Sequence, residues 1–443
     1  MSCGRLLPVL VWIAAVVGVA AAPSTLGSPA SPLDALVLSS NLWDLTRGEL
    51  TAAAKPLKAY WVSEEQQTAR STAPGASFLG LPVVETLIRV AGEKVSGVDL
   101  SFYNRGDVGD IGEDEYAARA ASVEKALTAL TGAAGRDISG RQDTRHDRVV
   151  RTLTWSDGTR CFYLAASHSW RQGPASRKRE PLPEFVNLAI TPDAGRRVGK
   201  VTPQKAVGGA IGLRERVEAT PKGDVRLVGI PMVDQGGKGY CAVASTERIL
   251  RYYGVDASQH DLAQRARTAS GGGTDPESLV RAIKGMAEPM GICVRTIEHT
   301  DISQIKQLVG DYNRAARKQG VAEVVLPTSG VIMLQDIYNS MDRQTYLLAR
   351  RPSQVELNRF SSAIDAKISA GCPLLWGVVL GFVPEQVELP QARGGHMRLI
   401  IGHNPKTREV LYSDSWGPGH ELKRMGVDDA YAITTGLYTI EPK

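Results

Sequence analysis

The chain has 443 residues, of which 43% are hydrophobic and 22% are charged, and these proportions are ordinary for a folded globular protein. This length allows two domains or three small ones, each with its own buried core. The formal net charge of +5 is small for such a chain and the basic residues are spread along it, which argues against nucleic acid as a partner.

The first 22 residues are typical of a secretory signal peptide. Arg5 precedes an apolar run rich in small residues, and Val19–Ala21 fits the small-x-small pattern that signal peptidase cleaves. The run is shorter than the roughly 20 residues that a membrane-spanning helix needs, and no later stretch reaches that length. We therefore expect a secreted or periplasmic protein whose mature chain starts near Ala22 and carries no integral membrane segment.

Cysteine usage does not indicate a disulfide scaffold. Of the five cysteines, Cys3 lies in the predicted signal peptide, so only four remain in the mature chain. Cys161 and Cys372 lie in or beside apolar runs and are expected to be small buried residues, whereas Cys293 is either a third such residue or a disulfide partner of one of them. Cys241 differs from these three, because it follows a glycine-rich loop.

The first half of the mature chain is predicted to be a flexible leader followed by one α+β domain. Residues 23–34 are rich in Pro, Ser, Ala and Gly, and the domain extends over 35–193. Apolar residues at helical spacing predict a helix over about 82–91. Alternation predicts a strand over 95–103, and an alanine-rich segment predicts a helix over 115–133.

The same domain ends in a predicted hairpin and a further strand. Asp157-Gly158 between two apolar runs is a strong hairpin signal, and residues 185–192 are predicted to add another strand. His146 and His168 are isolated, so no combination of nucleophile, base and acid is evident here. The sequence leaves a binding, an inhibitory and a structural role open for this domain.

The second half has a different order of elements. Residues 194–229 show little periodicity and are predicted to be a linker, and residues 230–443 a second α+β domain in which helices precede strands. Helical periodicity, glycine stops and capping patterns then predict helices over 240–254, from 258, from 274, from 301 and over 355–369. Apolar runs and period-two alternation predict strands over 373–380, 397–402, 408–414 and 436–442.

Four residues of this domain match the requirements of thiol hydrolysis. Cys241 opens a predicted helix, where backbone N–H groups and the helix dipole favour a thiolate. His396 begins one strand and Asp414 ends the next, so pairing within one hairpin can place the acid beside the base. Gln235 lies six residues before the cysteine and offers an amide donor for an oxyanion. Trp416 could shield the histidine–aspartate hydrogen bond from water.

At these residues the chain resembles the papain-like cysteine peptidase superfamily. The segment from Gln235 to Cys241 is similar to the oxyanion glutamine and the nucleophile of that superfamily, and DSWG at 414–417 resembles its Asn-Ser-Trp-Gly segment. RYYG, GTDPESLVRAI and the final GGHMRLIIGHN…VLYSDSWG hairpin are similar to the branch of double-glycine-leader (bacteriocin-processing) peptidases. That branch commonly has aspartate as its third residue, which agrees with Asp414. The resemblance covers about 228–443 and implies a helical subdomain packed on an antiparallel sheet.

Other assignments of the histidines and acids remain open. His403 and His420 compete with His396 as the base, although His403 lies at the far end of its strand, where it better suits a turn. A metal site of three side chains is less plausible, because the acid near the helix start is better explained by capping and the helix dipole. Those three side chains are Asp256, His260 and Asp261. No metal and no cofactor is therefore expected.

The sequence thus predicts an exported cysteine peptidase that acts on a peptide or protein substrate. Cys241 would be the nucleophile, His396 the base and acid, Asp414 the residue that orients it, and Gln235 the oxyanion donor. The alternatives are an inactive papain-like scaffold or binding protein, and a thiol amidase or acyltransferase. The position of the first domain before the catalytic one also suggests intramolecular regulation, such as blockage of the cleft.

Overall fold

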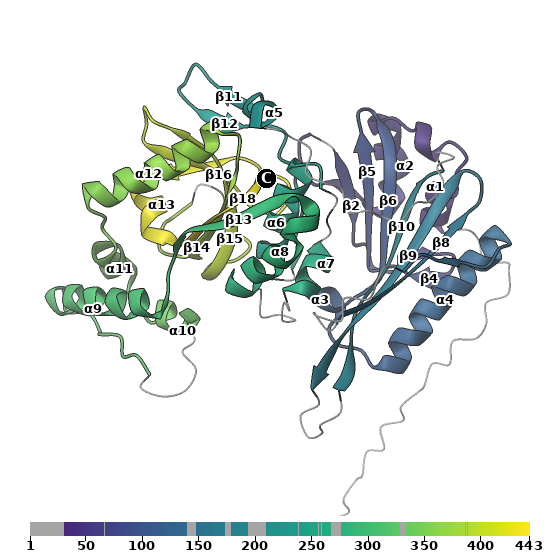
Figure 1. Ribbon diagram of the computed structural model, residues 1–443, viewed down its shortest axis with the longest axis horizontal. Helices are drawn as coiled ribbons and strands as arrows, with labels where there is room; N and C mark the ends of the chain where they lie inside the picture. Colours follow the sequence, from purple (N-terminus) through teal and green to yellow (C-terminus); the bar gives the residue numbers. More distant parts are fainter. Residues whose placement is uncertain are drawn as a thin grey trace, which may run out of the picture.

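The protein is described here by a computed structural model with two α+β units, each built on its own antiparallel sheet (Figure 1). The predicted signal peptide, His146 and Thr274 lie outside the described residues. The structure describes residues 31–65, 67–139, 148–172, 179–193, 210–237, 239–255, 257, 259–266, 276–327, 334–385, 387 and 389–443.

The N-terminal unit is centred on a sheet with the strand order β1-β2-β5-β6-β10-β9-β8-β7. Its strands are β1 (Tyr60–Trp61), β2 (Thr68–Ser71), β5 (Glu85–Ala91), β6 (Lys94–Asn104), β7 (Arg136–Asp137), β8 (Arg148–Ser156), β9 (Arg160–Gln172) and β10 (Arg179–Pro192), and a separate ribbon pairs β3 (Ser77–Phe78) with β4 (Leu81–Pro82). The predicted hairpin is confirmed, because Asp157 and Gly158 lie in the turn between β8 and β9. The predicted strands at 95–103 and 185–192 are confirmed as parts of β6 and β10.

Helices cover one face of this sheet (Figure 1). The longest is α4 (Glu113–Thr131), predicted at 115–133, whose Val123 and Leu127 pack in one core with apolar residues of β9 and β10 such as Phe162 and Leu188. Shorter helices are α1 (Pro32–Val37) and α2 (Arg47–Ala53), with two 3-10 turns at Leu42–Asp44 and Lys55–Leu57, whereas α3 (Arg105–Val108) lies on the side of the C-terminal unit (Figure 1). Successive side chains of a strand point to opposite faces of the sheet. The strand residues that alternate with the core residues therefore face the C-terminal unit.

The helix predicted over 82–91 is wrong, because Pro82 ends β4 and Glu85–Ala91 form β5 between β2 and β6. Ile88 and Val90 point into the apolar core, while Leu87 and Arg89 belong to the opposite face. Apolar residues at 87, 88 and 90 are compatible with helical spacing as well as with a strand, and the pairing partners on both sides decide between the two.

The C-terminal unit contains a second antiparallel sheet, with the order β11-β12-β15-β14-β18-β13. A further pair of strands extends from β15 through β16 to β17. The strands are β11 (Val217–Ala219), β12 (Val225–Leu227), β13 (Ile292–His299), β14 (Leu374–Leu380), β15 (Gly394–Asn404), β16 (Glu409–Ser413), β17 (Lys423–Gly426) and β18 (Thr434–Pro442). All four predicted strands are present, whereas β13 was not predicted because its apolar residues are few and irregularly spaced.

Helices pack on both faces of this sheet, which explains why β14 and β15 read as continuous apolar runs. One face carries α6 (Cys241–Tyr252), α7 (Gln259–Arg265) and α8 (Pro276–Met290), and the other carries α9 (Ile302–Gln319), α10 (Leu334–Asn339), α11 (Arg343–Ala349), α12 (Gln354–Ser369) and α13 (Val427–Ile433). Five of these helices match the predicted ones, and the short α10, α11 and α13 were not predicted. The fold class is the predicted one, a helical subdomain plus an antiparallel sheet that follows a separate α+β unit.

The described structure differs from the predicted boundaries at two places. The chain enters α1 at Pro32, before the predicted end of the flexible leader at 34. The predicted linker 194–229 contains α5 (Ala210–Arg214) and the strands β11 and β12, and β12 pairs with β15 of the C-terminal sheet. Short strands between turn residues carry too few side chains for periodicity to detect them.

None of the helices in the described part of the chain is long and apolar enough to cross a membrane. The cysteines Cys161, Cys241, Cys293 and Cys372 are all free thiols, and Cys161 and Cys372 are buried, as predicted.

Candidate active site

The thiol of Cys241 lies at the first residue of α6, where the helix leaves backbone N–H groups unpaired. Burial alone would raise the pKa of this thiol, but the adjacent His396 and the N–H groups of Met397 and Ala242 outweigh burial and lower the pKa below its ordinary value. The residue keeps partial solvent exposure. Cys241 is therefore a cysteine whose surroundings favour the thiolate, the form that acts as a nucleophile.

His396 connects this thiol to Asp414. Its Nε2 lies 2.9 Å from Oδ1 of Asp414, and both side chains are completely buried. The other ring nitrogen, Nδ1, has no oxygen or nitrogen partner in the described chain, and this leaves it for Cys241. Burial by itself lowers the pKa of His396, but the neighbouring Cys241 and Asp414 raise it above its usual value. The opposite shifts of thiol and imidazole favour a thiolate–imidazolium pair.

The carboxylate of Asp414 is held by two further cations that the sequence analysis did not identify. The Nε of Arg398 lies 2.8 Å from Oδ1, and the ammonium of Lys423 contacts Oδ2. Burial alone would raise the pKa of Asp414, but Arg398, His396 and Lys423 together hold it well below its usual range. Asp414 is therefore charged throughout the pH range in which a peptidase of this kind would act.

A second buried carboxylate balances these cations. Glu385 accepts from Nη2 of Arg398 at 2.6 Å, from the hydroxyl of Tyr412 at 2.7 Å and from Lys423 at 3.4 Å. The strand register explains why Arg398 reaches Asp414: Leu399 pairs with Ser413, so the next positions along the two strands are Arg398 and Asp414. The site thus contains alternating buried charges, which is the condition under which buried ions are stable.

Arg248 links the nucleophile helix to the end of β16. Its guanidinium donates to the carbonyls of Pro231 at 2.9 Å and Asp414 at 2.8 Å, and to Oγ of Ser413 at 2.6 Å. Burial lowers the pKa of Arg248 to about 10. This side chain lies opposite the apolar face of α6, and its three contacts fix the helix that carries Cys241 relative to the strand that carries Asp414.

Gln235 is positioned by Ser415, the residue after Asp414. The backbone N–H of Gln235 donates to the carbonyl of Ser415 at 2.8 Å, and Oγ of Ser415 donates to Oε1 of Gln235 at 2.7 Å. Since this contact occupies the amide oxygen, the Nε2 end of the buried side chain is the donor left for a substrate oxygen.

Trp416 stacks on the imidazole of His396, with ring centroids 4.0 Å apart and an angle of 9° between the planes. This position agrees with the expected shielding of the histidine–aspartate hydrogen bond. The competing histidines lie elsewhere: His403 pairs with Asp365 at 3.2 Å, and His420 contacts Lys423 at 3.2 Å.

The N-terminal unit contacts the loop that precedes Gln235. Arg70 of β2 forms a buried ion pair with Glu85 at 2.8 Å inside its own unit and another with Asp234 at 2.9 Å across the interface. The hydroxyl of Tyr60 donates to the same carboxylate of Asp234 at 2.8 Å. Asp234 in turn accepts from the N–H of Gly236 at 2.8 Å, so these contacts shape the glycine-rich loop on both sides of Gln235.

The residues that the sequence analysis missed share one property, which is that their role depends on tertiary pairing. For Arg398 the sequence offered one signal, which is a charged residue inside an apolar strand. Because a fully buried arginine needs an acidic partner, this position indicates a buried ion pair. Ser415, Lys423 and Glu385 carry no comparable local signal. Among the described residues, no group of three His, Cys, Asp or Glu side chains could hold a metal ion, and Asp256 lies outside the described residues.

A helical subdomain on an antiparallel sheet, with a thiol at a helix N-terminus beside a buried histidine, defines a papain-like cysteine peptidase domain. Sequence comparison agrees with this class, because the family model described as Peptidase_C39 like family matches residues 227–437. Residues 227–437 are thus similar to the C39-like peptidases.

Two solved structures are similar to parts of the chain. The peptidase domain of Streptococcus ComA, a bi-functional ABC transporter involved in a quorum-sensing pathway, is 14% identical, and the match covers 48% of this chain and 100% of that one with a TM-score of 0.25. Xylellain, a cysteine protease from Xylella fastidiosa, is 11% identical, and the match covers 56% of this chain and 94% of that one with a TM-score of 0.27. No curated protein matches the sequence.

Proposed function

We propose that this protein hydrolyses peptide bonds with Cys241 as nucleophile, His396 as general base and acid, and Asp414 as the residue that orients the imidazole. The thiolate attacks the substrate carbonyl carbon, and Nε2 of Gln235 donates to the oxyanion that develops. His396 then protonates the leaving amine, and the acyl group stays on the sulfur. Water, deprotonated by His396, releases the acid product and restores the thiolate.

The observation that carries this proposal is the continuous contact from Cys241 through His396 to Asp414. The lowered pKa of the thiol and the raised pKa of the imidazole define a pH window in which the ion pair exists. Activity should rise with pH as the pair loses its first proton and fall as it loses its second. The two limbs of the curve belong to the coupled pair and to neither residue alone.

The test is labelling with a thiol-directed electrophile at about pH 6, where an ordinary thiol is almost wholly protonated. We expect fast labelling of Cys241 that is lost in Cys241→Ala and slowed at least tenfold in His396→Ala, because the thiolate then loses its counter-ion. Cys293, which is also partly exposed, is the internal control and should react slowly. The Gln235→Ala variant should label normally yet turn over peptides at least tenfold more slowly, because the amide acts on the oxyanion.

Labelling of Cys241 that does not depend on His396 would contradict the ion pair and favour an inactive scaffold. If labelling behaves as expected but a peptide library is not cleaved, a transfer to another acceptor or cleavage of another amide bond would take the place of peptide hydrolysis.

We further propose that the N-terminal unit regulates the site by supporting the loop at Gln235, through Arg70, Tyr60 and Asp234. The contacts of Arg70 and Tyr60 with Asp234 support a bracing role, because they hold the loop that carries Gln235. Replacement of Arg70, described in the Discussion, separates the two, because a brace predicts lower activity and a block predicts higher activity.

We also propose that the protein is exported, on the basis of the signal-peptide pattern in residues 1–22. Expression of the full chain in a bacterial host should give a mature protein outside the cytoplasm whose intact mass corresponds to a start near Ala22. A full-length protein that stays in the cytoplasm would contradict this proposal.

A further inference from the structure

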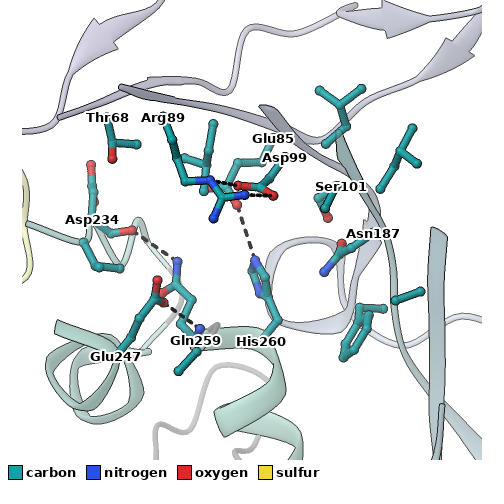
Figure 2. Close-up of a pocket in the computed structure, with 18 of the residues that line it drawn as sticks. Thr68, Glu85, Arg89, Asp99, Ser101, Asn187, Asp234, Glu247, Gln259 and His260 are labelled. Carbon is teal, nitrogen blue, oxygen red and sulfur yellow. Dashed lines mark hydrogen bonds and ion pairs between the residues drawn. The ribbon is translucent and has the colours of Figure 1, made fainter. Parts of the chain in front are cut away.

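A cavity of about 400 Å³ lies between the exposed face of the N-terminal sheet and the helices α6 and α7 (Figure 2). Residues of β2, β5, β6, β9 and β10 form one wall, and residues of 232–234, α6 and α7 form the other. None of Gln235, Cys241, His396 and Asp414 lines it. The cavity is thus a separate site at the junction of the two units, and its volume lies within the range of small-molecule pockets.

A row of polar side chains crosses three neighbouring strands in this wall. Strand register places Glu85 of β5 opposite Ser101 of β6, and Ser101 opposite Asn187 of β10. Side chains at register partners on one face lie side by side. A protein core would carry apolar residues at these positions, as the other face of the same sheet does.

Three oxygen atoms in the cavity lack a hydrogen-bond partner among the described residues: Oγ of Ser101, Oδ1 of Asn187 and Oε1 of Gln259. Ser101 is 4% exposed and Gln259 is 3% exposed. The Nε2 of Gln259 donates to the carbonyl of Asp234 at 3.4 Å, so that contact leaves the oxygen end of the amide toward the cavity. Buried polar atoms are nearly always satisfied by protein or by ordered water, so these three mark positions where water or a bound ligand completes the hydrogen bonds.

The charges of the wall indicate which molecule is accepted. The lining contains two more carboxylates than guanidinium groups, namely Glu85, Asp99, Asp234 and Glu247 against Arg89 and Arg251. Arg70, which lies behind the wall and pairs with Glu85 and Asp234, offsets one of the two. The guanidinium groups therefore leave one carboxylate in excess, and His260, whose Nε2 lies 3.5 Å from Glu85, is the remaining basic side chain of the lining. The unpartnered atoms at Asn187 and Gln259 only accept hydrogen bonds.

We propose that this cavity binds a small ligand that carries a primary ammonium group. An ammonium offers N–H donors and no acceptor, which suits the neighbouring unpartnered oxygens of Ser101 and Asn187 in a lining with one carboxylate in excess of the guanidinium groups. Bound there, its ammonium contacts Ser101 and Asn187 of the N-terminal unit, and the rest of the ligand lies in the cavity against the C-terminal unit, where Gln259 lines the other wall. The ligand therefore stabilises the contact between the two units, and this effect does not depend on the catalytic residues.

The experiment uses the mature chain with 1,5-diaminopentane as the probe and 1,5-pentanediol as its uncharged match of equal length. Titration calorimetry at fixed ionic strength should show binding of the diamine at least tenfold tighter than that of the diol, and the diamine should raise the melting temperature. The double variant Ser101→Ala with Asn187→Leu should bind the diamine at least tenfold more weakly. Asn358→Leu, an exposed change on α12, should leave the affinity unchanged.

A second variant keeps the proposal testable if the double variant fails to fold. Asn187→Asp preserves the shape of the side chain and adds a negative charge to the row, so it should bind the diamine several-fold more tightly and leave the affinity for the diol unchanged. Equal binding of diamine and diol, or no change of affinity in Asn187→Asp, would overturn the proposal and indicate a cavity filled by water or by a neutral polyol.

Discussion

Replacement of Asp414 by asparagine should destabilise this protein by about 3–5 kcal/mol, although the two side chains have the same shape. The wild-type carboxylate is fully buried and contacts Arg398, Lys423 and His396. The amide removes the negative charge and leaves two buried cations without it. Peptidase activity should fall by roughly 10²–10⁴-fold, because the imidazolium loses its stabilising charge. Chemical denaturation and kcat/KM measure the two effects.

The stability difference between wild type and Asp414→Asn should depend on pH in one direction. The pKa of Asp414 is depressed by folding, so its contribution to stability is fully present above its unfolded pKa of about 3.9 and is lost only as pH falls through the lower folded value. The stability difference between wild type and Asp414→Asn should therefore be constant above about pH 5 and shrink in stronger acid. An increase of the difference in acid would contradict the assignment of a charged Asp414.

Two comparisons show whether the effect comes from the buried charge. Asp365→Asn, at a carboxylate that is 61% exposed, should change stability by less than about 0.5 kcal/mol. Lys423→Met should recover part of the loss when it is combined with Asp414→Asn, because it removes one of the two buried cations that no longer face a carboxylate at position 414. Strict additivity of the two replacements would mean that Lys423 and Asp414 do not interact.

Replacement of Arg70 by methionine should cost about 3–5 kcal/mol of stability and lower peptidase activity. The side chain of Arg70 is 5% exposed and connects Glu85 to Asp234 across the interface, so the variant leaves two carboxylates buried without their counter-ion. The loop from Asp234 to Gly236 then loses its support, and the oxyanion donor Gln235 with it. Urea denaturation and kcat/KM on a peptide substrate are the measurements.

The matched control is Arg151→Met in the same unit, which removes an ion pair with Glu124 at 2.8 Å. Arg151 is 53% exposed, so the change should cost less than about 1 kcal/mol and leave activity unchanged. Higher activity in Arg70→Met would contradict a brace and indicate that the N-terminal unit blocks the site. Unchanged activity would mean that the N-terminal unit does not influence the active site through Arg70.

Local signals led to four proposed site residues and did not lead to the residues around them. Cys241 follows a glycine-rich loop and opens a helix, and His396 and Asp414 stand at the ends of strands in one hairpin, so spacing alone favoured them. The contacts of Asp414 with Arg398 and Lys423 arise from the pairing of β15, β16 and β17. The register between two strands depends on the packing of the whole sheet, so it could not be predicted from the local sequence of either strand.

The helix over 82–91 was predicted wrongly for the same reason, because strand pairing decides the structure of this segment. The apolar residues of this segment suit a helix as well as a strand, and the segment became β5 because β2 and β6 pair with it on both sides. Where the pattern was long and capped, as in α9 with its capping box at Asp301, the prediction was confirmed.

The sequence by itself determined the class of the C-terminal half, five of its helices and four of its strands, and it pointed to the residues that carry the proposed chemistry. These features depend on local spacing and on side-chain type, which are properties of short segments. Only the tertiary structure decided how the buried charges around Asp414 are balanced, how Arg70 reaches the loop at Gln235, and that a polar cavity lies between the units. Each of these joins residues far apart in the chain, whose apposition depends on the packing of complete sheets and helices.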